Sequence, residues 1–106
     1  MSITRIQEEC DVWVNRNFPN RSKAAVIGGL GEEVGEVLRA CVKHDQGIRG
    51  TADEWMYELE KELGDVFIKL CDVANFYDID LELAIVNRWH SVQKRDWVTD
   101  PEKGGQ

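Results

Sequence analysis

The sequence contains few helix breakers and no excess of positive charge. Only two prolines occur in 106 residues, Pro19 and Pro101, so long stretches lack the residue that most strongly interrupts a helix. Acidic residues outnumber basic ones by 20 to 13, and the net charge of −7 argues against nucleic acid or an anionic membrane as a partner. No apolar run approaches the length of a membrane span, and Met1–Cys10 lacks the apolar core of a signal peptide. We therefore expect a single cytoplasmic domain.

Side chains that bind soft metals are also scarce. The three cysteines, Cys10, Cys41 and Cys71, form no C-x-x-C pair, and each lies in an apolar helical pattern. A buried reduced thiol behaves as a small apolar side chain, so we expect all three to be structural. His44 and His90 have no acidic or histidine partner at ligand spacing, and we expect both at the surface.

Four segments carry apolar residues at helical spacing, with turn residues between them. The predicted helices run from Ile3 to Asn17, from Lys23 to about His44, from the Thr51 cap to about Phe76, and from the Asp80 cap to about Arg95. Ser22 is expected to cap the second helix, and Thr51 with Glu54 forms a capping box. Gly28, Gly29 and Gly31 leave open a shorter second helix that begins at Leu30, since each glycine costs about 1 kcal/mol against alanine.

The predicted helices have more apolar surface than one small chain can cover. The expected buried positions include Trp13 and Val14; Ile27, Leu30, Val34, Val37, Leu38 and Cys41; Trp55, Leu59, Leu63, Val66, Phe67, Leu70 and Val73; and Leu81, Leu83, Ala84, Val86, Trp89 and Val92. In a chain of this size, each of the four helices has some apolar surface that no other helix of the same chain can cover. We therefore expect a homodimer or homotetramer that completes the bundle.

Two pairs of acids stand out in this pattern. Glu33 and Glu36 lie three residues apart in the second helix, and Glu62 and Asp65 do so in the third, so each pair shares one helix face. Position 49 is halfway between Glu33 and Asp65 and also halfway between Glu36 and Glu62. It lies in the turn from Gly47 to Thr51, which is rich in helix-breaking residues. An antiparallel hairpin would place the two pairs level with each other, roughly 20 Å from the turn. Four such oxygen-bearing groups suit a hard divalent cation such as Mg²⁺.

The segment from Leu30 to Glu36, followed by that from Glu62 to Val66, resembles the E-E-x-x-E … E-x-x-D signature of the MazG-like all-α nucleoside triphosphate pyrophosphohydrolases. The similarity extends from about Trp13 to Trp97. Members of this family hydrolyse (d)NTPs between the α- and β-phosphates and release a monophosphate and pyrophosphate, with Mg²⁺ or Mn²⁺ as cofactor. The resemblance implies an all-α, four-helix domain over residues 1–98. Pro101, Gly104 and Gly105 predict a flexible tail over residues 99–106. A narrower substrate, a purine nucleotide such as dGTP, is compatible with the resemblance, but no residue of the sequence determines which base is bound.

The resemblance also implies roles for individual residues. Glu33, Glu36, Glu62 and Asp65 would hold the metal, and Glu33 would thereby take part in catalysis. Glu32 would orient or deprotonate the attacking water. It lies about 100° around the helix from Glu33, so a solvated surface role remains equally open.

The remaining candidates would contact the nucleotide. Lys69 follows Asp65 by one turn, and Arg88, Lys94 and Arg95 stand where related sequences carry phosphate-binding Lys and Arg residues. The match is loose there, because Val92 replaces a residue that is often polar, and a solvated helix face explains the same cations. Trp13, Trp55 and Phe18 are candidates for stacking on the base, with core packing as the competing interpretation.

Two other classes of protein compete with this reading. A ferritin-like di-iron bundle needs Glu-x-x-His pairs, and neither acidic pair contains a histidine. A non-catalytic helical interaction module would explain the acids as a solvated face. Against it stand the matched register and the cost of gathering four like charges without a counter-ion.

Overall fold

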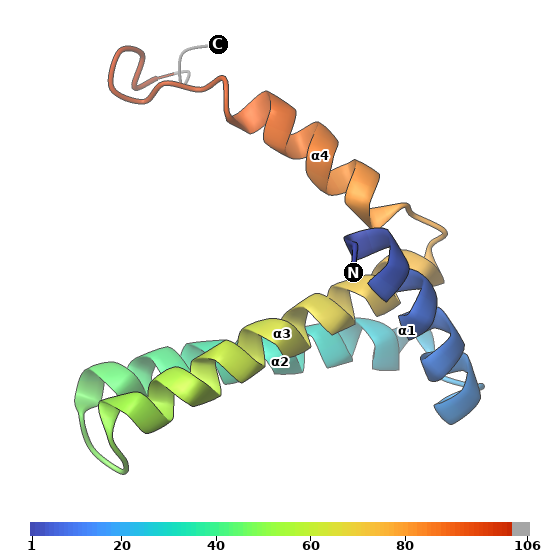
Figure 1. Cartoon of the computed structure of the whole chain (residues 1–106), viewed down its shortest axis with the longest axis horizontal. Helices are drawn as coiled ribbons and strands as arrows, with labels where there is room; N and C mark the ends of the chain where they lie inside the picture. Colours follow the sequence, from blue (N-terminus) through green and yellow to red (C-terminus); the bar gives the residue numbers. More distant parts are fainter. Residues whose placement is uncertain (103–106) are drawn as a thin grey trace.

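The computed structural model describes residues 1–102, and this part of the chain consists of helices and turns. The helices are α1 (Ile3–Asn17), α2 (Lys23–Gln46), α3 (Ala52–Phe76) and α4 (Leu81–Val92). α2 and α3 form an antiparallel pair, α1 packs at the end of that pair far from its connecting turn, and α4 extends away from the other three (Figure 1). The predicted all-α, four-helix fold is confirmed. Of the predicted tail, residues 103–106 lie outside the described part of the chain.

The predicted caps fix where the helices begin. The Ser22 side chain accepts a hydrogen bond from the backbone N–H of Ala25, and that of Asp80 accepts one from Leu83. Thr51 and Glu54 form both hydrogen bonds of the capping box. α2 therefore begins at Lys23, and the alternative of a loop up to Leu30 is wrong.

The fourth helix is three residues shorter than predicted. α4 ends at Val92, and the N–H groups of Lys94 and Arg95 bond three residues back, as in a turn. Asp96 then accepts hydrogen bonds from the N–H groups of Val98 and Thr99, at 3.0 and 3.1 Å. These local bonds compete with continuation of the helix.

The turn between α2 and α3 has the predicted position and unusual backbone angles. Gly47 ends α2 in the left-handed region, with φ at 67°, and Arg49 and Gly50 also have positive φ values. The indole Nε1 of Trp55 donates to the carbonyl of Arg49 at 3.0 Å, and the Arg39 guanidinium lies 5.5 Å from the indole centroid. Trp55 thus closes the turn end of the hairpin.

A small core lies where α1 crosses α3. Cys10, Val14 and Cys71 are buried there, and burial raises the pKa of the Cys10 thiol to about 11, with smaller contributions from nearby Cys71, Asp72 and Asp11. The prediction of a structural, buried thiol is confirmed for Cys10 and Cys71. It is wrong for Cys41, which is exposed because no described element covers that face of α2.

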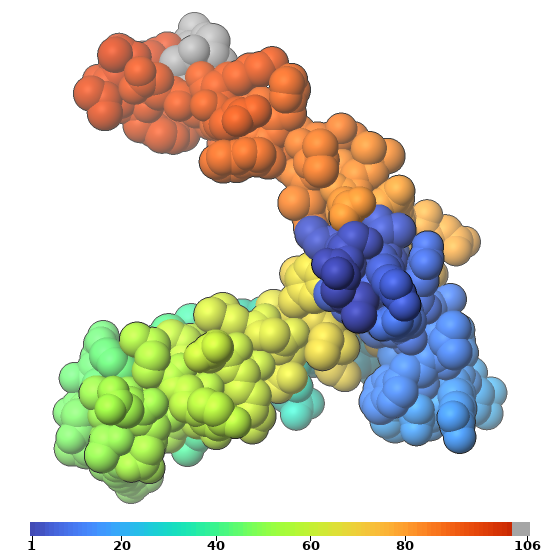
Figure 2. Space-filling model, viewed as in Figure 1, coloured from blue at the N-terminus to red at the C-terminus, as the bar shows by residue number. Residues whose placement is uncertain are grey.

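Much of the predicted apolar surface remains uncovered in the single chain. The residues predicted to be buried but found exposed are Trp13, Ile27, Val34, Leu38, Cys41, Leu63, Leu70, Leu83, Val86 and Trp89. Trp89 and Leu38 are each 61% exposed, and α4 has no buried residue. The physical reason is that α4 contacts only α1 and α3, so one face of the hairpin and most of α4 face outward (Figure 2).

A polar network fixes the start of α4 against the rest of the chain. The side-chain amide of Gln7 donates to the Asn75 side chain at 3.0 Å and to the Ile79 carbonyl at 2.8 Å, and its oxygen accepts from the Leu81 N–H at 3.0 Å. The Asn75 amide donates in return to the Gln7 carbonyl at 3.0 Å. The buried Gln7 thus holds the start of α4 against α1 and the end of α3.

Within residues 1–102, no helix is both long enough and apolar enough to cross a membrane.

Replacing Gln7 with alanine tests this network. The substitution leaves the Leu81 N–H, the side-chain oxygen of Asn75 and the Ile79 carbonyl without the Gln7 side chain as a partner, in a half-buried site. We therefore expect the free energy of unfolding to fall by about 2–4 kcal/mol. Urea denaturation at matched protein concentration measures it. The exposed Gln93, whose side chain makes no described contact, is the matched control, and Gln93→Ala should change stability by less than about 0.5 kcal/mol. Equal losses in the two variants would contradict the assignment.

Candidate metal centre and nucleotide site

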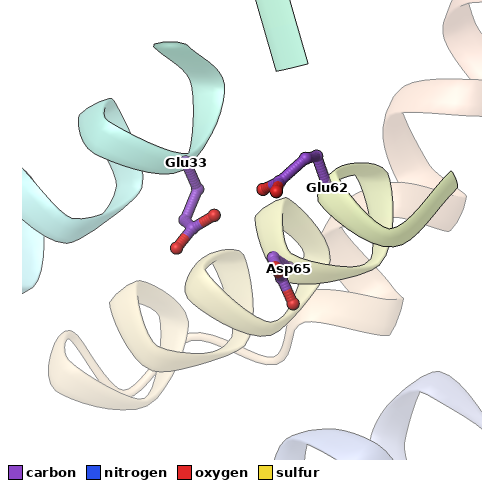
Figure 3. Close-up of side chains that lie close together, drawn as sticks. All are labelled: Glu33, Glu62 and Asp65. Carbon is purple, nitrogen blue, oxygen red and sulfur yellow. The ribbon is translucent and has the colours of Figure 1, made fainter. Parts of the chain in front are cut away.

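Three carboxylates converge between α2 and α3. Glu33 reaches across from α2 toward Glu62 and Asp65 on α3 (Figure 3). One carboxylate oxygen from each lies within 4.8 Å of the others. Glu62 is 8% exposed, and Glu33 and Asp65 are half-buried, so the cluster is set into the helix pair while remaining reachable from solvent.

The antiparallel register of the hairpin creates this cluster. Glu62 and Asp65 share one face of α3 because they are three residues apart. Glu33 stands as far before the turn as Asp65 stands after it, so the two helices bring them level. The spacing predicted this convergence.

The cluster is electrostatically unfavourable when it holds no cation. Removal of Glu62 from water raises its pKa, and so do its hydrogen bond with Glu33 and the negative charges of Asp65 and Glu33, while Lys61 acts in the opposite direction. The ion pairs found among residues 1–102 include none of the three carboxylates. A divalent cation would remove the repulsion, and oxygen-only donors suit Mg²⁺ or Mn²⁺. The donor set therefore fits such an ion.

The other two predicted acids lie outside the cluster. Glu36, one turn closer to the hairpin end, is exposed, and its carboxylate is not among the gathered oxygens. Glu32 is exposed on the neighbouring side of α2. The structure thus brings together three of the four predicted ligands, and the roles of Glu36 and Glu32 stay predictions.

Lys69 connects the carboxylate cluster to a cavity. It follows Asp65 by one turn on the same face of α3, and its side chain runs along α2 at Gly29, where its Nζ lies 3.5 Å from the position that a Cβ would occupy. The lysine side chain thus lies in van der Waals range of the α2 backbone at Gly29. Lys69 also lines a cavity of about 190 Å³.

This cavity lies between the end of α1, the start of α2 and the C-terminal half of α3. Its walls are formed by Trp13, Val14, Phe18, Arg21, Ala25, Val26, Ile68, Lys69 and Asp72. The rings of Trp13 and Phe18 meet edge to face, with centroids 5.9 Å apart, and both side chains are more than half exposed. An aromatic surface next to a small cavity is what a nucleobase requires for stacking.

Sequence reasoning missed two charged residues in this cavity. Arg21 and Asp72 form an ion pair, with Nη2 of Arg21 2.9 Å from Oδ1 of Asp72 and side-chain exposures of 14% and 9%. A signal for Asp72 was present, because Asp65, Lys69 and Asp72 form one polar row at spacings of four and three along a mostly apolar helix. Arg21, in a turn, carried no comparable signal.

The remaining predicted contact residues lie apart from the carboxylates. Arg88 is on α4, and Lys94 and Arg95 follow it, while α4 makes no contact with α2 in the described chain (Figure 1). Trp55 is engaged at the turn end of the hairpin. The single chain therefore does not assemble these four residues with the cluster.

The histidines take no part in the site. His90 is exposed, and His44 is half-buried with its Nδ1 3.7 Å from a carboxylate oxygen of Asp45. The group of carboxylates that can hold a metal contains neither of them.

Comparisons with known proteins identify the family of this chain. The family model of the MazG nucleotide pyrophosphohydrolase domain matches residues 21–97, which include all three clustered carboxylates. Among curated proteins, the chain is similar to the uncharacterized protein YpjD of Bacillus subtilis (strain 168), with 32% identity over 102 residues, covering 92% of this chain and 91% of YpjD. No solved structure matches. The acidic signature, the helical fold and the family match together show that the chain belongs to the MazG nucleotide pyrophosphohydrolase domain family.

Proposed function

We propose that this protein hydrolyses nucleoside triphosphates to monophosphates and pyrophosphate with the help of Mg²⁺ or Mn²⁺. The observation that carries the proposal is the convergence of Glu33, Glu62 and Asp65, none of which forms an ion pair with a basic side chain within residues 1–102. The unit responsible is the domain of residues 1–98, within which the family match falls. In the reaction, a water oxygen forms a bond to the α-phosphorus, the bond from that phosphorus to the α–β bridging oxygen breaks, and pyrophosphate leaves.

The three carboxylates would hold the ion, and Glu36 would join them through a rotation of its exposed side chain. When bound, the cation supplies charge neutralisation for the phosphates and lowers the pKa of water in its coordination shell. Glu33 and Glu62, which share a hydrogen bond in the ion-free site, must both be ionised to bind it. Glu32 is next to Glu33 in sequence and is the candidate that accepts the proton of the attacking water.

The row of residues along α3 then orients the nucleotide. Lys69 lies one turn from Asp65 and its ammonium group is free to pair with a phosphate oxygen, since it forms no ion pair in the described chain. Beyond it, Trp13 and Phe18 offer their rings to the base. Positioning of this kind supplies much of the rate enhancement in phosphoryl transfer.

The uncovered apolar faces support association with a second copy of the chain, as a homodimer or homotetramer. α4 buries none of its residues, and the hairpin leaves Leu38 and Leu63 exposed. Because α4 extends away from its own carboxylates, Arg88, Lys94 and Arg95 would contact phosphate only in the site of another copy. The same surfaces fit the alternative of a non-catalytic interaction module, which the activity measurement distinguishes.

Hydrolysis products test the reaction directly. With Mg²⁺ and each dNTP, we expect monophosphate and pyrophosphate, and we expect Glu33→Gln and Asp65→Asn to lower kcat at least about 100-fold, because each removes a charge that holds the cation. Glu60→Gln, an exposed acid on the same helix, should keep wild-type activity. Orthophosphate and diphosphate as products would assign a different reaction. No product from any nucleotide would support the interaction module.

Metal binding should also appear as a change in stability. At an Mg²⁺ concentration 100 times Kd, binding to the folded state adds about 2.7 kcal/mol, so we expect Tm to rise by roughly 10 °C in a thermal melt. Glu62→Gln should raise Tm without Mg²⁺, since it removes a repelled charge, and should lose most of the Mg²⁺ response. An unchanged Mg²⁺ response in this variant would exclude Glu62 as a ligand.

The pH dependence of the Glu62 effect has a defined sign. The pKa of Glu62 is higher in the fold than in the unfolded chain, so its repulsion destabilises the ion-free fold above the folded pKa. That penalty disappears as the pH falls through the folded pKa toward about 4.3, the ordinary glutamate value. The Tm difference between Glu62→Gln and wild type should therefore shrink on acidification. A difference that grows instead would contradict the electrostatic account.

Light scattering tests the association. We expect a mass at least twice that of the 12.2 kDa chain, and we expect Trp89→Glu to lower it, since the charge would be buried at the contact. Val98→Glu, at an exposed position outside the helices, is the control. A wild-type mass of one chain at all concentrations would refute this part of the proposal.

A further inference from the structure

The ion pair in the cavity is poorly satisfied by the protein itself. Nε of Arg21 and Oδ1 of Asp72 are buried without an aligned hydrogen-bond partner, although Oδ1 lies 2.9 Å from Nη2 of Arg21. Asn15 accepts a hydrogen bond from Nη1 of Arg21 at 3.1 Å, and no hydrogen bond in residues 1–102 reaches the second carboxylate oxygen of Asp72. Both side chains line the cavity, and the groups that they can offer it are the Nη N–H groups of Arg21 that Asn15 and Asp72 do not use and the second carboxylate oxygen of Asp72.

A purely structural role explains this pair incompletely. It does connect the α1–α2 turn to α3, but a buried ion pair contributes little net stability unless its remaining polar atoms are satisfied. A ligand that places an acceptor beside a donor would satisfy both groups at once. Two charged side chains in a cavity with aromatic and aliphatic walls are the usual composition of a small-molecule site.

The position of the cavity relative to the carboxylates selects a nucleotide as this ligand. Asp65, Lys69 and Asp72 follow one another on the same face of α3, and seven residues correspond to about 10 Å along the helix. Phosphates at Asp65 and Lys69 would therefore place the base toward Asp72. The cavity of about 190 Å³ is smaller than the usual range for a whole drug-sized ligand, so it fits the base alone.

We propose that Arg21 and Asp72 make this cavity selective for 6-oxopurines, which carry the O6 acceptor next to the N1–H donor. This inference rests on the proposed function, because the phosphate end of the substrate is placed by the carboxylate cluster. Arg21 donates to O6, and Asp72 accepts from N1–H and, in guanine, from the 2-amino group. Adenine presents the reverse order of donor and acceptor in the same orientation, which sets its N1 lone pair against a carboxylate. A purine also covers more of the Trp13 ring than a pyrimidine does.

Binding of monophosphates without metal tests the selectivity apart from catalysis. With EDTA present, calorimetric titration of the full chain should show dGMP and dIMP binding at least 10-fold more tightly than dAMP, dCMP and dTMP. dIMP is the decisive probe, because it keeps O6 and N1–H but lacks the 2-amino group. Binding of dAMP or dTMP as tight as that of dGMP, or binding of dIMP as weak as that of dAMP, would overturn the proposal.

Variants assign the effect to residues. In Asp72→Asn, the amide can turn either its oxygen or its NH₂ to the base, so the preference of dIMP over dAMP should fall to within about 2-fold. Trp13→Ala, at a position 57% exposed, should weaken the binding of the purines about 10-fold, keep the preference of dIMP over dAMP, and reduce the preference of dIMP over dTMP. Glu60→Gln should change neither. A dIMP preference that persists in Asp72→Asn would contradict the assignment. If that variant fails to fold, the wild-type dIMP–dAMP comparison still decides.

Hydrolysis assays separate this inference from the proposed function. If the protein with Mg²⁺ releases pyrophosphate from all four dNTPs at equal kcat/KM, the function stands and the selectivity proposal fails. If dGMP and dIMP bind selectively but no triphosphate is hydrolysed, the selectivity of the cavity stands and the proposed function fails.

Discussion

The α2–α3 hairpin holds together three carboxylates that repel one another, and the rest of the structure must compensate for this repulsion. Glu33, Glu62 and Asp65 come within 4.8 Å of one another at no benefit to the fold alone. The hairpin must therefore be stabilised elsewhere. Its turn supplies part of this through the Thr51–Glu54 capping box and the contact of Trp55 with Arg49, and α1 supplies more through the core around Cys71. The site is thus an unfavourable cluster within a favourable scaffold, as is common where a fold prepares a place for a cation.

The row of Asp65, Lys69 and Asp72 gives the site a direction. The carboxylates mark one end, Lys69 stands in the middle, and the cavity with Trp13 and the Arg21–Asp72 pair marks the other end. A nucleotide has the same sequence of chemical groups, with anionic phosphates at one end and a flat hydrogen-bonding ring at the other. Family membership indicates the class of chemistry, and the residues of this chain give that chemistry its proposed orientation.

The sequence predicted local structure and register well, because both depend on short spacings. The caps at Ser22, Thr51 and Asp80 and the levelling of Glu33 with Asp65 follow from helical geometry alone. The predicted end of α4 was wrong because Asp96 accepts local hydrogen bonds that favour a turn. The burial predicted for Leu38, Leu63 and Trp89 was wrong for a single chain, because amphipathic spacing shows that a face is apolar but not what covers it. The Arg21–Asp72 pair was missed because its partners are 51 positions apart and meet only through the packing of a turn against α3.

The central claim is that Glu33, Glu62 and Asp65 together hold one divalent cation. A crystal structure of the protein soaked in Mn²⁺, with the ion located by its anomalous scattering, tests this most directly. The account predicts a single strong peak bonded to an oxygen of each of the three residues, at about 2.0–2.2 Å, as expected for a small hard cation. A Mn²⁺-soaked crystal with the three side chains well ordered and no peak among them would contradict it.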